Sequence, residues 1–145
     1  MQALTAEQYA RVNQLAKAWR DCHLKAAKRE PHFNPRLSVD ALCFQPQRLP
    51  DGRQGLLGAL VTPLSLSLVV VADGVAGASP LPTTLPLALP AGHFVLEREA
   101  LGEHDGYWRC ELLADLSDIE TLQAGSRLAQ QLMERVMTPA APQGG

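Results

Sequence analysis

Aromatic side chains are scarce in this chain of 145 residues, because Phe, Trp and Tyr together make up 5% of it. Hydrophobic residues as a whole reach 46%, so leucine, valine and alanine have to fill the core. A chain of this length is expected to form one domain with one core. Positive charge is not in excess either, since the formal net charge is −2. That balance argues against nucleic-acid binding, which normally requires a basic surface.

The motifs of common catalytic and cofactor sites are also missing from the sequence. No Gly-x-Gly-x-x-Gly, P-loop or Gly-x-Ser-x-Gly pattern occurs. Cys22, Cys43 and Cys110 stand apart instead of forming the close pairs of a zinc site. In a reducing compartment such cysteines are expected to be small buried hydrophobic residues. We therefore predict no metal, no cofactor and no catalytic residue.

A secretory signal is absent from residues 1–8, which hold no basic segment followed by an apolar one. This start predicts a protein that stays in the cytoplasm.

Charge is nearly absent from residues 54–96, a stretch of 43 residues in which Asp73 is the single charged residue. Residues 54–72 approach the ~20 apolar residues that a membrane-spanning helix needs. Pro63 in the middle of them, and the period-two alternation of Leu64–Leu68, favour strands over a helix. The sequence therefore predicts no membrane insertion. The expected strands are 56–62 and 64–71, joined at Thr62-Pro63.

Two helices are expected to flank the run of strands. Thr5, with Gln8 three residues later, forms a capping box that begins an amphipathic helix ending near Arg29. Ser117 and Glu120 form a second box that begins a C-terminal helix. Further strands are predicted over 37–44, 85–89, 93–96 and 107–113, with turns over 46–52 and 102–106.

The predicted fold class is α+β, because consecutive strands with short connections favour antiparallel pairing. We expect an N-terminal helix, a mostly antiparallel sheet of five or six strands and a C-terminal helix, with the helices packed on one face of the sheet. A single domain should span residues 1–137, and residues 138–145 should form a disordered tail.

Acidic residues gather in 97–120, where eight acids and two bases give a charge of −6, whereas the first thirty residues carry +3. Two interpretations stay open. The two segments could be solvated faces that complement each other, or the acidic segment could attract a basic peptide. Glu97, Glu99 and Glu103 lie at the start of the acidic segment.

Four segments, in order and with matching spacing, resemble the HybE/HupJ-type assembly chaperones of [NiFe] hydrogenases. Residues 34–41 read Asn-Pro-Arg-Leu-Ser-Val-Asp-Ala and are followed by Phe44. Residues 57–68 read Leu-Gly-Ala-Leu-Val-Thr-Pro-Leu-Ser-Leu-Ser-Leu, residues 90–94 read Pro-Ala-Gly-His-Phe, and residues 106–112 read Gly-Tyr-Trp-Arg-Cys-Glu-Leu. The resemblance covers about residues 34–135. The chain departs from the family pattern at Leu64 for Trp, Ser67 for Asn, and residues 114–116 for Ser-Pro-Met.

The resemblance implies a cytoplasmic chaperone, not an enzyme, that holds a hydrogenase subunit before assembly and export. The implied client is the small subunit with its twin-arginine signal peptide. An apolar surface around the Thr62-Pro63 break, and strand edges beside prolines, could accept an extended client segment. The acidic segment could attract its arginines. The candidate partner-binding residues are Asn34, Pro35, Thr62, Pro63, Leu64, Leu66, Leu68, Glu97, Glu99, Glu103 and Tyr107.

Two other interpretations stay open. The chain could be a small-ligand-binding or enzymatic domain with a pocket lined by Tyr107, Cys110 and His93. It could also be a structural module in which the uncharged stretch forms the core and a homodimer interface.

Overall fold

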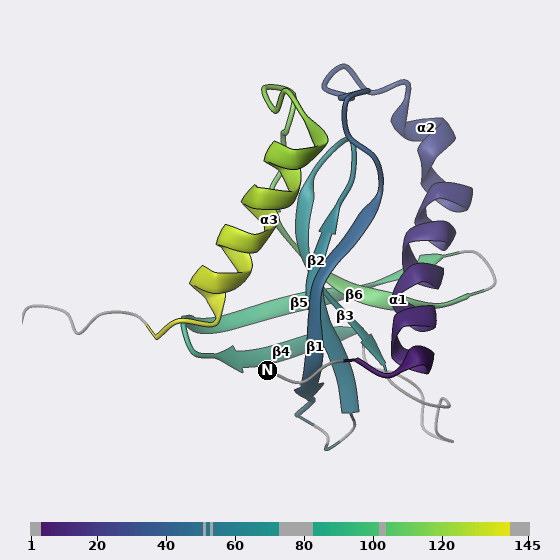
Figure 1. Cartoon of the computed structure of the whole chain (residues 1–145). Coiled ribbons are helices and arrows are strands. Elements are labelled where there is room, and N and C mark those ends of the chain that lie inside the picture. The colour runs from purple at the N-terminus through teal and green to yellow at the C-terminus, as the bar shows by residue number, and fades with distance from the viewer. Residues whose placement is uncertain (1–3, 51, 53, 73–82, 102–103, 140–145) are drawn as a thin grey trace, which may run out of the picture.

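The computed structural model describes residues 4–50, 52, 54–72, 83–101 and 104–139 (Figure 1). Within these ranges an N-terminal helical segment precedes six strands, and a helix follows them. The helical elements are α1 (Ala6–Trp19), the π-helical turn η1 (Arg20–Leu24), α2 (Lys25–Ala27) and α3 (Leu122–Val136). The strands are β1 (Asp40–Arg48), β2 (Gln54–Val61), β3 (Leu66–Ala72), β4 (Thr84–Leu89), β5 (Gly92–Leu101) and β6 (His104–Leu113).

The strands form one sheet in the order β1-β2-β3-β6-β5-β4, and every neighbouring pair is antiparallel. This confirms the predicted α+β class and the six-stranded antiparallel sheet. The predicted tail begins at residue 138, of which residues 140–145 lie outside the described ranges. The predicted turn over 102–106 is shorter, because β5 continues to Leu101 and β6 already begins at His104.

The two long helices cover opposite faces of the sheet, not one face as predicted (Figure 1). Side chains alternate between faces along a strand. Leu66, Leu68 and Val70 of β3 therefore pack in one cluster with α3, whereas Val69 and Val71 pack in the other with α1. The β2–β3 pair is thus apolar on both faces, which explains its nearly uncharged sequence.

The start of α1 is the predicted capping box. The Thr5 hydroxyl accepts a hydrogen bond from the backbone N–H of Gln8 at 3.1 Å, and the Gln8 side-chain oxygen accepts one from the N–H of Thr5 at 2.8 Å. The second predicted box is wrong. The N-cap of α3 is Thr121, which accepts from the N–H of Ala124 at 3.0 Å.

The connection before α3 stays irregular because a buried side chain binds its carbonyl groups. The Asn34 amide nitrogen donates to the carbonyls of Leu116 at 2.8 Å and Ile119 at 2.7 Å. The Asp115 carboxylate also accepts from the N–H of Ser117 at 2.8 Å. Hydrogen bonds from the side chain of Ser117 and then from its backbone lower the pKa of Asp115. These bonds favour a turn at the position where the sequence pattern predicts a helix start.

Strand β1 continues through Pro46, where the sequence predicts a turn. Pro46 is tolerated inside this strand because its backbone nitrogen points away from β2. The N–H of Thr62 donates to the carbonyl of Ser65, so alternate residues of β2, including Leu56, turn their hydrogen-bonding groups toward β3. Pro46 lies opposite Leu56, so its nitrogen points off the free edge of β1, where a proline costs no ladder bond.

The other edge strand, β4, carries a proline in the equivalent position. The N–H of Arg98 donates to the carbonyl of Thr83 at 2.8 Å, so these two residues form a hydrogen-bonded pair. Hydrogen-bonded and non-bonded pairs alternate along an antiparallel ladder. Pro86, opposite Val95, therefore also directs its nitrogen away from the sheet. Both edges lack a donor that an added strand would need, which argues against the predicted capture of a client strand beside the prolines.

A bulge in β1 lets an aromatic ring lie on the backbone of β2. The register shifts between Leu42 and Gln45, and Cys43 has a positive φ of 60°. The displaced Phe44 ring covers Gly58, where a Cβ atom would lie 2.3 Å from the Phe44 Cδ1 atom. Gly58 is thus required for this contact.

Candidate functional site

The predicted leucine surface is largely inside the protein. Leu66 and Leu68 are 0% exposed and pack on the α3 side of the sheet, while Leu64, in the β2–β3 turn, stays partly exposed. The alternation of leucine and serine predicts a strand, and β3 begins at Leu66. Ser67, on the other face of this strand, is buried as well.

The β2–β3 turn is held by three residues that are themselves buried, namely Asn34, Thr62 and Pro63. The Thr62 hydroxyl accepts from the N–H groups of Leu64 at 3.1 Å and Ser65 at 3.0 Å. The carbonyl of Pro63 accepts from the N–H of Asn34 at 2.9 Å. Of the predicted Asn34-Pro35 pair, Pro35 is the exposed member.

A pocket of about 370 Å³ lies between the N-terminal helical segment and the α1 side of the sheet. Four of the predicted residues meet there, namely Thr62, Leu64, Glu99 and Tyr107. Glu97 is exposed on β5, directly opposite Arg109, which also lines the pocket. Glu103 lies outside the described residues. Of these four residues, Tyr107 is also one that the sequence predicts for the lining of a small-ligand pocket.

An ionic network centred on Arg109 forms the sheet side of the pocket. Its guanidinium group donates to Glu99 Oε2 at 3.3 Å, to Glu111 Oε1 at 3.0 Å and to the Ser67 hydroxyl at 3.3 Å. Burial lowers the pKa of Arg109, but Glu99 and the other acidic neighbours raise it by more. Arg109 therefore stays charged and fixes both carboxylates.

Tyr107 is fully buried behind this network. Its hydroxyl group donates to Glu99 Oε2 at 3.4 Å and interacts with Trp19 of α1. Burial first, and then the charge of Glu99, raise the pKa of Tyr107 well above its ordinary value. Tyr107 is thus a neutral donor that links the helix to the carboxylate.

The helix side of the pocket carries His23, which lies in the π-helical turn η1. Its ring centroid is 5.4 Å from that of Trp19, and its Nε2 atom is 3.7 Å from Glu99 Oε1. That nitrogen is buried and makes no hydrogen bond. The sequence predicts a packed histidine on a regular helix, and has no pattern that reveals a π turn. Such turns are frequent at functional sites.

The comparison with protein families decides the identity of the chain. The family model described as "[NiFe]-hydrogenase assembly, chaperone, HybE" matches residues 10–144. The chain belongs to the HybE family. Its role in that family is hydrogenase assembly, not catalysis, as the resemblance implied.

The fold agrees with a solved member. The solution structure of HybE from Escherichia coli matches this HybE-family chain with a TM-score of 0.61 and 22% identity, over 92% of this chain and 83% of that chain. At this identity the likeness supports the fold alone. No curated protein sequence matches the chain.

Features of a metal or nucleophilic site do not occur in the described part of this HybE-family chain. No group of three or more His, Cys, Asp or Glu side chains there could hold a metal ion. Cys110 packs against the core on the α3 side, where burial raises the pKa of its thiol, and such a cysteine is a poor nucleophile. His93 is exposed on β5, so of the three residues predicted to line a small-ligand pocket only Tyr107 does so.

Among the described residues, none of the helices has both the length and the apolar character that a membrane span requires.

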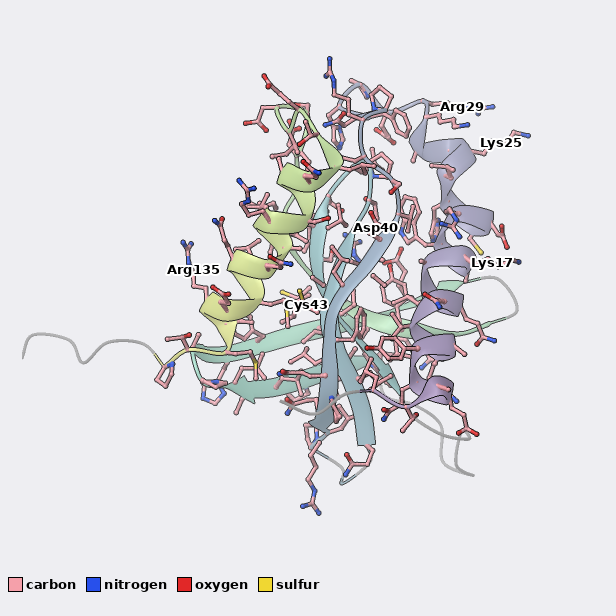
Figure 2. The ribbon with its side chains drawn as sticks, viewed as in Figure 1. Lys17, Lys25, Arg29, Asp40, Cys43 and Arg135 are labelled. Atoms are coloured by element: carbon pink, nitrogen blue, oxygen red, sulfur yellow. The ribbon has the colours of Figure 1, made fainter. Side chains whose placement is uncertain are left out.

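The basic residues of the N-terminal segment do not neutralise the pocket. Figure 2 shows Lys17, Lys25 and Arg29 pointing away from the sheet, and all three are exposed. Lys17 pairs with Asp21 of its own helix at 3.2 Å. The acidic groups on the sheet side of this HybE-family chain therefore line the pocket, whereas these three basic side chains point away from it.

Proposed function

We propose that this HybE-family chaperone acts in the cytoplasm and binds the small subunit of a [NiFe] hydrogenase, together with its twin-arginine signal peptide, before assembly and export. The family supplies the hydrogenase client. The choice of subunit rests on the pocket, where the carboxylates of Glu30, Glu99 and Glu111 lie beside apolar groups of Trp19 and Leu64. A signal peptide offers both a basic and an apolar part to such a surface.

In this proposal the predicted partner-binding residues divide into two groups. Pro35, Leu64, Glu97 and Glu99 have exposed surface and contact the client. The buried ones hold the shape of the contact surface, and their replacement acts on folding first. These are Asn34, Thr62, Pro63, Leu66, Leu68 and Tyr107.

The test compares client capture by matched charge-reversed variants. Glu97→Lys combined with Glu111→Lys reverses the charge of Glu111, which lines the pocket, and of Glu97, which lies opposite Arg109 of the pocket wall. Glu7→Lys combined with Glu134→Lys makes the same charge change at exposed glutamates outside the pocket. We expect the first variant to bind the signal-peptide-bearing small subunit about tenfold more weakly at low salt, with the difference shrinking in high salt. The control should bind like the wild type.

Co-purification with the small subunit, with and without its signal peptide, supplies the measurement. Equal recovery of both forms would contradict the role of the signal peptide. Recovery of neither form, under conditions in which the chaperone is folded by circular dichroism, would contradict the choice of subunit.

A further inference from the structure

Two polar atoms face each other in the pocket at a distance that leaves both without a hydrogen bond to the other. Glu99 Oε2 accepts the hydrogen bonds from Tyr107 and Arg109, whereas Glu99 Oε1 faces His23 Nε2 at 3.7 Å. This distance is too long for a hydrogen bond. His23 Nε2 is buried and has no partner. A buried polar atom without a partner is costly. In the tautomer that carries its proton on Nδ1, His23 Nε2 is an acceptor, and a donor that reaches both atoms would be stabilised there.

The charge of the pocket favours a cationic donor. Among its described lining residues three carboxylates, those of Glu30, Glu99 and Glu111, face one guanidinium group, that of Arg109. Counted over these carboxylates and this guanidinium group alone, the net charge is −2. The Glu99 side chain is 32% exposed, so it is screened only in part and can be reached from outside.

The shape of the pocket favours a guanidinium group over an ammonium group. Its volume of about 370 Å³ suits one long side chain and a short piece of backbone. Glu99 Oε1 and His23 Nε2 are two separate acceptors, which match the fork of N–H groups on a guanidinium better than a single point charge. The Trp19 ring beside them suits a planar, weakly hydrated cation.

We propose that this pocket binds the side chain of one arginine in an extended segment of the client, with Glu99 and His23 as its acceptors. This inference rests on the proposed function. It adds a site for one arginine of the client, which side chains of β5 and of the π turn bind. Arg109 fixes Glu99 from behind and leaves Oε1 directed at the incoming group.

The test uses the full chain and three labelled peptides that differ at a single position. The position holds arginine, lysine or citrulline in an otherwise identical stretch of serine and leucine residues. Citrulline has the shape of arginine but no charge. Fluorescence anisotropy at low salt should give binding of the arginine peptide about tenfold tighter than the citrulline peptide, with lysine between them.

Two variants locate the effect. Glu99→Gln should remove the preference for arginine over citrulline. Glu134→Gln, at an exposed glutamate of α3 outside the pocket, should keep it. Should Glu99→Gln fail to fold, Glu30→Gln at the rim is the second variant, and it should reduce the preference by a smaller factor.

The two indole N–H signals provide an internal control by NMR. Trp19 lines the pocket, and Trp108 packs on the α3 side of the sheet. The arginine peptide should shift the Trp19 signal and leave that of Trp108 in place. Equal affinity for arginine and citrulline, no binding of the arginine peptide, or a shift of Trp108 alone would overturn this proposal. Co-purification of the small subunit with the same protein sample tests the proposed function separately, so the arginine site can fail while the proposed function holds.

Discussion

Asn34 links three connections of the chain through one buried side chain and its own N–H group. The side chain is 2% exposed and donates to the carbonyls of Leu116 and Ile119. Its oxygen accepts from the N–H of Arg36 at 3.0 Å, and its own N–H reaches the carbonyl of Pro63. The resemblance placed Asn34 among partner-binding residues. The geometry gives it a role in joining the β2–β3 turn to the start of α3.

Replacing Asn34 by alanine should therefore lower the free energy of unfolding by about 2–4 kcal/mol, because the buried carbonyl of Leu116 and the partly buried carbonyl of Ile119 lose their donor. Urea unfolding followed by circular dichroism measures this loss. Arg36→Ala is the control, since its side chain is exposed and its backbone N–H remains; it should change stability by less than about 0.5 kcal/mol. A similar small change for both variants would contradict the structural role of Asn34.

Tyr107 should make the stability of the protein depend on alkaline pH. Its pKa is raised in the folded chain, mainly by burial, whereas an unfolded tyrosine has a pKa of about 10. Above that value the unfolded chain loses the phenol proton first, so the contribution is complete below pH ~10 and decreases as the pH rises. Urea unfolding at pH ~8 and ~10.5 should show a smaller loss for Tyr107→Phe than for the wild type. Equal losses would show that Tyr107 ionises freely.

At the scale of elements, the bulge in β1 and the glycine in β2 depend on each other. Gly58→Ala would place a Cβ atom against the Phe44 ring, and we expect a loss of about 1–3 kcal/mol from this overpacking. In a Phe44→Ala background the space is free, so Gly58→Ala should become neutral or slightly stabilising. A double-mutant cycle by urea unfolding measures the coupling. Additive effects would rule out the ring contact as the reason for the glycine.

The prolines of the edge strands make a second prediction at this scale. Pro86→Thr would restore an N–H group on the free edge of β4, so the variant should self-associate more than the wild type. Ala88→Thr is the matched control. Ala88 is exposed on the same side of the same strand and already has its outward N–H. Sedimentation velocity over a range of concentrations should show larger species for Pro86→Thr alone, and their absence would count against edge protection.

Local signals in the sequence predicted the elements better than their ends. The Thr5 box is read from neighbouring residues, and the structure reproduces it. The place of Pro46 inside a strand is not predictable locally, because the direction of its nitrogen depends on the β1–β2–β3 register, which no local pattern contains. The box at Ser117 failed for a similar reason, since Asn34, about eighty residues earlier, binds the carbonyls around it.

For the whole molecule, the sheet separates two packing clusters. Leu15 of α1 and Met133 of α3 are each 5% exposed, and they belong to different clusters on opposite faces. Leu15→Ala and Met133→Ala should each cost about 2–5 kcal/mol, and the double variant should lose the sum within about 0.5 kcal/mol. Urea unfolding by circular dichroism and by tryptophan fluorescence measures both. A strongly non-additive result would mean that the two faces are coupled through the strands.

The pocket was only partly predictable because it depends on this two-sided arrangement. Tyr107, Arg109 and Glu111 alternate along one strand, so their common face could be read from the sequence. The helix opposite them could not, because the prediction placed both helices on one side of the sheet. The same error turned Leu66 and Leu68 into a surface, although α3 covers them.

The outward nitrogens of Pro46 and Pro86 also affect how readily such a protein aggregates with the polypeptides that it binds. A chaperone meets unfolded polypeptides throughout its lifetime, and each of them is a potential extra strand for an open sheet. An assembly factor whose two edge strands each lack one outward donor is a poorer template for such growth, so it can hold an unassembled subunit and release it again with less risk of aggregation.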